Sequence, residues 1–499
     1  MVVAVAALVP LGHLVVRGFE DGVAEVVDII VRERTLRLLI RSLVLAGTVT
    51  ALCVVIGVGL AVLVTRTDLP GRRFWGVVAA LPLAVPSYVA AFAWLAMTRE
   101  AASFLGLVTV LTACTYPYVY LPVVAALART DPALEDVARS LGRGRVHTLC
   151  SVTLRQVRPA IASGALLVSL YVLSDFGAPS ILRYDVFTRV IHQSYRASFD
   201  RTPAKVLSIV LVVVTLLITL GEQRSRGRAE HARLGSGVAR RPTRFALGRW
   251  RPFAPLLPAA VAVVALGIPG ASLGYWMWRG QTAGIELDRL TSATVATIGV
   301  GAVAAVVTTL CAIPLGILAA RYRTRGVHWL ENSAYAVHAL PGIVVALALV
   351  FLGVRFAQPF YQELPLLVAA YVVLFLPLAV GAVRSAVTQS SRRAEDVARS
   401  LGYGTWSVLR KVTLPVSGPG VAAGAAMVWL TCMKELPATL LLRPTGMDTL
   451  ATRLWSETGV RAFGAAAPYA IMLVVMAMIP TWWLGVRGGR DRREELFHE

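Results

Sequence analysis

The octapeptide EDVARSLG at residues 135–142 occurs a second time, letter for letter, at residues 395–402. The offset is 260 residues, about half of the 499-residue chain. When both copies are extended to Gly164 and Gly424, sixteen of the thirty aligned residues are identical. Self-similarity at one fixed offset indicates that the chain consists of two copies of a single structural unit.

Each copy is a polar segment between long apolar ones, which predicts a loop in water beside a membrane. Alanine and acidic residues favour a short helix, and Gly142 or Gly402 permits the backbone turn that ends it. The small side chains of Ala138 and Ala398 would let another surface approach closely. An ordinary amphipathic loop should diverge faster than the apolar helices around it, yet this loop is the best-matched part. The pattern therefore favours a functional loop.

The composition excludes an ordinary soluble protein, because 57% of the residues are hydrophobic and only 15% are charged. Apolar stretches repeatedly reach the ~20 residues that cross a bilayer. We expect an all-α polytopic membrane protein with about twelve helices, six in each half, at residues 1–16, 38–64, 74–97, 104–127, 161–182, 204–220, 253–276, 293–320, 330–352, 366–383, 421–442 and 465–486.

Three features refine this topology. The first apolar run has no basic residue before it, which predicts a membrane helix rather than a cleaved signal peptide. Several spans contain proline, which is tolerated in membrane helices where neighbours or a cavity satisfy the freed backbone groups. These helices either line a pathway or are kinked only for packing. Such intramembrane prolines include Pro82, Pro86, Pro117, Pro122, Pro341 and Pro377.

The net charge of +21 follows from topology. With the amino terminus inside, 31 of the 49 lysines and arginines fall in cytoplasmic segments, as the positive-inside rule requires. Residues 222–251 hold nine arginines and two glutamates, which indicates a basic cytoplasmic linker rather than a nucleic-acid or anionic-lipid patch. The chain then divides into a repeat at 1–221, this linker, and a repeat at 252–499. The repeated loops lie at 130–158 and 390–418.

No residue pattern indicates a catalytic centre. The three lysines do not follow glycine as in a phosphate-binding Gly-Lys-Ser/Thr loop. The five cysteines show no paired spacing, and the seven histidines include no His-Glu-x-x-His, so neither a metal site nor a disulfide framework is predicted. We therefore expect a protein without a cofactor that is not itself an enzyme.

The spacing Glu-x-x-Ala-x-x-x-Gly, followed ten residues later by Val-x-Leu, resembles the cytoplasmic coupling loop of permease subunits in ATP-binding-cassette importers. The resemblance implies two tandem type I permease repeats, related by a pseudo-two-fold axis normal to the bacterial inner membrane. It also implies a cytoplasmic ATPase dimer and an extracytoplasmic substrate-binding protein as partners, besides membrane lipid. The residues it assigns to ATPase coupling are Glu135, Asp136, Ala138, Gly142, Glu395, Asp396, Ala398 and Gly402.

Two details of the loops leave questions open. Glu135 and Glu395 could pair with a basic residue of the ATPase or cap their own helices, where an acidic group is favourable by ~0.3–1 kcal/mol. The first loop also departs from the family pattern, since Arg155 stands where the second loop has Pro415. This departure should leave the docking helix intact and shift only the exit from the loop.

The cargo is suggested by a second resemblance. Residues 433–444, MKELPATLLLRP, with the stretch LATRLW at 450–455, resemble the fused permeases of ferric-iron importers. Charged residues at a membrane helix end need a partner or water, which makes Asp175, Phe176, Lys434 and Glu435 candidate pathway residues. Carboxylate oxygens suit a hard cation such as Fe(III). The same residues could instead be anchors that face the outer headgroups.

Other functions stay open at this stage. Related fused permeases are associated with thiamine, phosphonates or polyamines. A secondary transporter or channel would work without ATP, but such transporters place their binding residues at broken helices in mid-membrane, whereas the strongest repeat here is a water-exposed loop. A membrane-embedded enzyme would need an acid–base or metal constellation. The sequence therefore favours a permease driven by a docked motor, with iron as the cargo.

Overall fold

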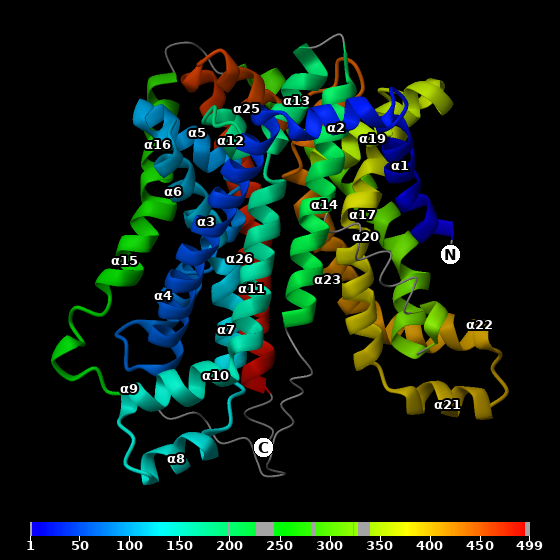
Figure 1. The fold of residues 1–499 in the computed structure, drawn as a ribbon. Helices are drawn as coiled ribbons and strands as arrows, with labels where there is room; N and C mark the ends of the chain where they lie inside the picture. Colours follow the sequence, from blue (N-terminus) through cyan, green and yellow to red (C-terminus); the bar gives the residue numbers. More distant parts are fainter. Residues whose placement is uncertain are drawn as a thin grey trace. The chain divides into compact units, whose positions relative to one another are not determined.

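The computed structural model describes residues 2–197, 200–225, 244–280, 286–322, 324–327 and 340–494. Every regular element in these ranges is a helix, apart from an isolated bridge between Thr67 and Phe245. Figure 1 shows the helices in sequence colours. The all-α class expected from the sequence is confirmed.

Many of these helices are long and apolar. Within the described residues, eight helices could cross a membrane, and a bent pair would make a ninth. Two shorter apolar helices, Gly342–Phe356 and Phe463–Met478, add to them. This set is consistent with the expected twelve helices in two repeats. Part of one expected span, residues 330–339, lies outside the described residues.

By their contacts the residues form two compact units, which are described separately. Unit N comprises Glu33–Val190, Val213–Thr282 and Val474–Glu499. Unit C comprises Met1–Arg32, Ile191–Val212 and Ala283–Leu473. Three helices have residues in both units: α13 (Phe187–Ala197), α14 (Thr202–Ser225) and α26 (Phe463–Glu494). The repeat boundaries expected from the sequence stay a prediction.

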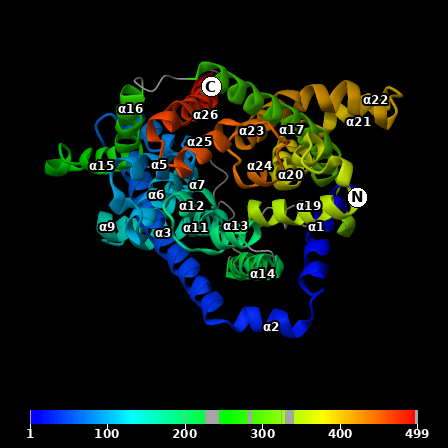
Figure 2. The ribbon, with the colours of Figure 1, turned by 90° about the horizontal axis from the view of Figure 1, so that it is seen from above.

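Unit N is built around three mutually packed helices, α3, α7 and α11 (Figure 2). Gly57 of α3 and Gly164 of α11 allow close approach, because a Cβ at either glycine would lie within 3 Å of Val119 on α7. The helices of this unit are α3 (Glu33–Arg66), α4 (Arg72–Val78), α5 (Ser87–Met97), α6 (Phe104–Thr115), α7 (Pro117–Leu127), α8 (Pro132–Ser140), α9 (Arg145–Thr148), α10 (Leu154–Gln156), α11 (Arg158–Ser174), α12 (Gly177–Ile181), α15 (Leu256–Ala262) and α16 (Ile268–Gly280).

Unit C repeats this core with α17, α20 and α23. Gly316 allows α17 to approach α20 closely, because a Cβ added to this glycine would lie 2.6 Å from Val383 of α20. The helices of this unit are α1 (Val2–Gly18), α2 (Val23–Val31), α17 (Leu287–Arg321), α19 (Gly342–Phe356), α20 (Leu364–Gln389), α21 (Arg392–Ser400), α22 (Thr405–Val408), α23 (Leu414–Met433), α24 (Pro437–Leu442) and α25 (Leu450–Gly459).

One span that the sequence predicted as continuous, at 74–97, is bent, which corrects that prediction. It bends by 93° between Arg72–Ala84 and Ser87–Met97, because Pro86 has no N–H to continue the helix. The expected span at 161–182 corresponds to the candidate span Arg158–Ile181, which contains a helix break at Asp175 between α11 and α12. The expected span at 421–442 has a helix break after Met433, before α24. The candidate pathway residues lie at the last two breaks.

Each unit also contains an early helix of the other half of the sequence. In unit N, α16 packs on α5, where Ser272 Oγ donates to the Ala93 carbonyl (2.7 Å) and Trp276 Nε1 to that of Ala96 (3.1 Å). In unit C, α1 packs on α19, and the rings of His13 and Phe356 lie 5.4 Å apart. The two halves of the chain are therefore interleaved within both units.

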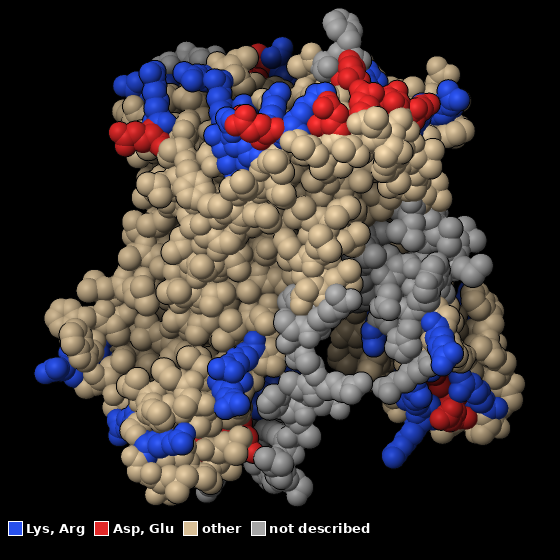
Figure 3. Space-filling model, viewed as in Figure 1, with Lys and Arg blue, Asp and Glu red and all other residues tan. Residues whose placement is uncertain are grey.

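Charged side chains are separated from the apolar helix surfaces. On the face drawn in Figure 3, lysine, arginine, aspartate and glutamate gather at the two ends of the helices, with an uncharged band between them. Large apolar side chains such as Val55 (71% exposed) and Leu310 (61%) are turned outward from the long helices. Such exposure matches helices whose outer faces contact lipid rather than water.

Candidate functional site

The repeated octapeptide forms the same local structure in both units. It supplies most of α8 in unit N and α21 in unit C, each nine residues long and lying outside the long helices (Figure 1). A second short helix follows in each loop and continues through one π-helical turn. In unit C this turn, at residues 409–413, leads directly into α23. In unit N the turn at residues 149–153 leads into the short α10, which ends at Gln156, just before α11. A helix–turn–helix results, as expected from the sequence.

The glycines that end these helices adopt the left-handed conformation. Gly142 has φ +78° and Gly402 has φ +86°. The amide of the next residue bonds back five positions, from Arg143 to the Ala138 carbonyl (3.1 Å) and from Tyr403 to that of Ala398 (3.1 Å). This is the Schellman arrangement, for which glycine is the favoured residue. The turn predicted at both glycines is therefore present.

In unit N the glutamate of the loop is turned inward. Glu135 is completely buried, and its Oε1 is ion-paired with Nη2 of Arg66, the last residue of α3. Thr153 of the π-helical turn donates to the same oxygen at 2.8 Å. Arg66 is itself 1% exposed and also donates to Thr130 Oγ1 at 2.9 Å. The carboxylate thus joins α8 to the end of α3 and to the turn that follows.

Unit C repeats the arrangement residue for residue. Glu395 is 5% exposed, and its Oε1 accepts hydrogen bonds from Nη2 (2.6 Å) and Nε (3.1 Å) of Arg321, the last residue of α17. Thr413 donates to the same oxygen at 2.9 Å, and Arg321 donates to Ser390 Oγ at 2.6 Å. In both loops the glutamate is bound by an arginine of its own chain.

Sequence reasoning missed these arginines, which entered only the count of positive charges. A signal was present, because Arg66 and Gly71 recur as Arg321 and Gly326 at a common offset of 255 residues. The sequence left open an ATPase contact or helix capping for the two glutamates. In the structure they have a third role, because each braces its loop against the end of a long helix, α3 or α17. Their part in coupling stays a prediction, now as positioning residues.

The remaining predicted loop residues divide between two faces. Ala138 and Ala398 are buried, so their small side chains serve packing within the chain, whereas Asp136 and Asp396 are exposed. Beside these acids lies an apolar surface that we call the loop face. Its exposed side chains, between 56% and 75% accessible, are Val137, Leu141 and Val146 in unit N, and Val397, Leu401 and Trp406 in unit C.

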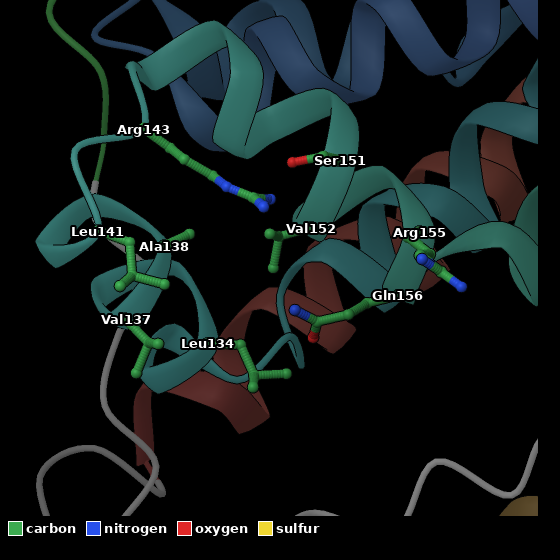
Figure 4. Close-up of a pocket in the computed structure, with 9 residues that line it drawn as sticks. All are labelled: Leu134, Val137, Ala138, Leu141, Arg143, Ser151, Val152, Arg155 and Gln156. Atoms are coloured by element: carbon green, nitrogen blue, oxygen red, sulfur yellow. The ribbon is translucent and has the colours of Figure 1, made fainter.

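A pocket of about 350 Å³ adjoins the loop face of unit N. Leu134, Val137 and Leu141 line its α8 side, and Val152 and Gln156 line the opposite side (Figure 4). Arg155, which departs from the family pattern, is among its lining residues. A concave apolar surface with a few polar groups at its rim is suited to receive side chains of a partner protein.

The first candidate pathway residue caps a helix. Asp175 accepts a hydrogen bond from Ser87 Oγ at 2.5 Å and another from the backbone amide of Ala178 at 3.0 Å. The latter bond satisfies an amide at the beginning of α12. Phe176 beside it is 1% exposed. Asp175 therefore ties the break after α11 to the start of α5.

Glu435 has the corresponding role in unit C. Its carboxylate accepts a hydrogen bond from the backbone amide of Ala438 at 3.1 Å. The Thr439 hydroxyl donates to the backbone carbonyl of Glu435 at 2.8 Å. Lys434, the preceding residue, is half-buried. Where unit N has Ser87 after a proline, unit C has Gly342, and a Cβ there would lie 3.0 Å from Glu435 Oε1. Each unit thus pairs one carboxylate with one small residue.

This complementarity gives a prediction. Asp175→Glu alone should lower transport about fivefold, because the added methylene crowds Ser87 in a packed site. The double variant Ser87→Gly with Asp175→Glu reproduces the pair found in unit C and should regain most of the lost activity. Transport by the two variants at equal amounts in the membrane measures this. Additive losses in the double variant would show that the two side chains do not act together.

Comparison with known proteins adds a family. The family described as "Binding-protein-dependent transport system inner membrane component" matches residues 53–221 and 312–486, so that each half of the chain carries one match. Both matched regions include a loop with its buried glutamate. The arginine that holds this glutamate, Arg66 or Arg321, lies inside the matched region as well.

Individual relatives differ in how much of the chain they cover. A Fe(3+)-transport system permease protein of Haemophilus influenzae is 36% identical over 479 residues, covering 95% of this chain and 94% of the relative. A provisionally named 2-aminoethylphosphonate transport system permease protein of Salmonella typhimurium is 28% identical over 38% of this chain. A molybdate/tungstate transport system permease protein of Thermococcus kodakarensis is 27% identical over 36% of it.

Proposed function

The chain belongs to the family of binding-protein-dependent transport system inner membrane components, and from this premise we propose that it imports ferric iron with energy from separate ATPase subunits. It is the permease subunit of such a system and a multi-pass protein of the inner membrane. The proposal concerns its cargo and the way in which its motor is attached.

The extent of similarity supports iron as the cargo. The iron-transport relative matches both repeats and the linker between them, whereas the phosphonate and molybdate relatives each match little more than a third of the chain. A match of that length is what shared permease architecture alone would give. Thiamine, phosphonate and polyamine therefore rank below ferric iron as cargoes.

Two loop faces support an ATPase dimer as the motor. Each repeat offers one short helix with exposed valine and leucine, and apolar patches of this kind mark protein contacts in membrane-adjacent loops. The sequence has no Gly-Lys-Ser/Thr loop of its own. ATP is then hydrolysed by partner subunits in the cytoplasm, while an extracytoplasmic binding protein delivers the cargo.

The buried ion pairs connect the loops to the membrane helices. A displacement of α8 by a docked ATPase would be transmitted through Glu135 and Arg66 to α3, which packs on α7 and α11. In unit C the corresponding path runs from α21 through Glu395 to Arg321, and so to α17, α20 and α23. Charge-assisted hydrogen bonds in a site closed to water are strong enough to act as such links. This arrangement favours a motor-driven permease over an ATP-independent transporter.

Cargo uptake tests this proposal directly. The chain is reconstituted in proteoliposomes with its ATPase subunits and binding protein, and import of ferric iron, thiamine, 2-aminoethylphosphonate and spermidine is measured with and without ATP. Iron import that requires both ATP and the binding protein is expected. Import of one of the other cargoes without import of iron would replace iron as the proposed cargo. Uptake that does not require ATP would contradict the proposal that ATPase subunits drive transport.

A further inference from the structure

The end of the linker contacts the coupling loop of unit N. We call the segment Arg244–Arg251, which leads into α15, the strap (Figure 1). Its Phe245 forms the isolated parallel bridge with Thr67: the Phe245 amide donates to the Arg66 carbonyl at 2.7 Å, and the Asp68 amide donates to the Phe245 carbonyl at 3.2 Å. The strap is therefore paired with the backbone of the residue whose side chain holds Glu135.

Side chains extend this contact to α8 itself. The guanidinium carbon of Arg139, on the coupling helix, lies 5.4 Å from the centre of the Phe245 ring. Asp68 accepts from the Leu247 amide at 2.8 Å and approaches Arg251 at 3.8 Å. A cation over an aromatic face is attracted by the ring quadrupole. The strap thus binds α8 on one side and the end of α3 on the other.

Among the residues that the structure describes, unit C makes the corresponding connection through a side chain of α21 itself. The carbonyl of Arg321, which corresponds to that of Arg66, accepts from Nη2 of Arg392 at 3.2 Å. Arg392 begins α21, and the equivalent position of α8 is Pro132, which has no donor to offer. Arg399, the counterpart of Arg139, donates to Asp396 at 3.0 Å within its own helix. Within the described part of unit C, the second loop is held by its own side chains.

From this difference we propose that the strap holds the first coupling loop in its docking orientation, with Phe245 as a positioning residue for coupling in unit N. The strap is then a structural part of one motor contact, and the described residues of the two contacts are not equivalent. The role in coupling rests on the proposed function above, whereas the hold on α8 does not.

Spin labelling of the chain without any partner tests the hold on α8. The exposed Cys150 and the partly exposed Cys311 are replaced (Cys150→Ser, Cys311→Ala), and a label is placed at Val137→Cys on α8 or, in a matched chain, at Val397→Cys on α21. We expect Phe245→Ala to raise the mobile fraction of the first label about two- to fivefold, the range of one cation–π contact, and to leave the second unchanged.

Three further variants separate the ring from general packing. Phe245→Tyr keeps the aromatic face and should restore the wild-type spectrum, whereas Phe245→Leu keeps bulk alone and should not. Phe253→Ala removes an exposed ring eight residues along the chain and should leave both labels unchanged. An unchanged label at residue 137 in Phe245→Ala, or equal changes at both loops, would overturn the proposal.

Transport in the full complex tests the role in coupling. The ratio of cargo imported to ATP hydrolysed should fall about two- to fivefold in Phe245→Ala and recover in Phe245→Tyr. A mobile α8 with a normal ratio would overturn the positioning role. A wild-type chain that imports nothing with ATPase and binding protein present would instead remove the proposed function, while the spin-label result would still decide the hold of the strap.

Discussion

Replacing Glu135 by glutamine is expected to lower transport about tenfold or more. The change leaves the Arg66 guanidinium buried without a countercharge. Removing one partner of a buried ion pair costs roughly 3–5 kcal/mol of free energy. Both side chains are at most 1% exposed, so water cannot replace the lost carboxylate. The helix α8 should then detach from the end of α3, and ATP hydrolysis should no longer drive import.

Two comparisons sharpen this result. Glu395→Gln should have a smaller effect, because the Arg321 side chain is 11% exposed, against 1% for Arg66, and water can reach it more easily. Ser140→Ala, at an exposed position on the same helix outside the predicted coupling set, should leave transport near the wild-type value. Import and ATPase activity are measured in one proteoliposome preparation at equal protein. Equal losses in Glu135→Gln and Ser140→Ala would contradict a brace formed by the buried pair.

Gly402→Val is expected to uncouple ATP hydrolysis from transport while the chain still inserts. At φ +86° a β-branched residue is strained by about 1–3 kcal/mol. An added Cβ would meet nothing within 4 Å, so backbone strain alone is responsible. The turn should open and rotate the loop face, which carries Leu401 and Trp406. Stimulation of the ATPase subunits by the chain, with import measured alongside, checks this expectation.

Asparagine supplies the control at this position. Because asparagine tolerates the left-handed region, Gly402→Asn should retain most of the transport that Gly402→Val loses. The same pair of substitutions at Gly142, where φ is +78°, should behave alike in unit N. If Gly402→Val transports as well as wild type with normal ATPase stimulation, the assignment of this loop as the docking site is wrong.

Much of the architecture could be predicted from the sequence, because membrane spans and tandem repetition leave direct traces in it. The octapeptide marked both loops, and Gly142 and Gly402 indicated where their first helices end. The helix breaks were less accessible. At the break after Met433, the Glu435 carboxylate caps the beginning of α24. The length of an apolar stretch does not reveal such a cap.

The interactions that hold the loops depend on contacts across many residues. Arg66 and Glu135 are 69 positions apart, and Arg139 and Phe245 are farther apart still. Neither pair belongs to one periodic pattern of the sequence. The count of positive charges therefore predicted only that these arginines lie on the cytoplasmic side of the membrane. Asp175 and Glu435 were predicted as pathway residues; they lie at helix breaks, where they cap short helices, and their part in transport stays a prediction. The pseudo-two-fold relation between the repeats likewise stays a prediction.

The ratio of iron imported to ATP hydrolysed, measured in the same proteoliposomes for wild type, Glu135→Gln and Gly402→Val, tests the central claim most directly. If the two loops transmit the work of docked ATPases through their buried glutamates, this ratio falls in both variants while the hydrolysis of the ATPase subunits alone is unchanged. A ratio that equals the wild-type value in both variants would contradict the account.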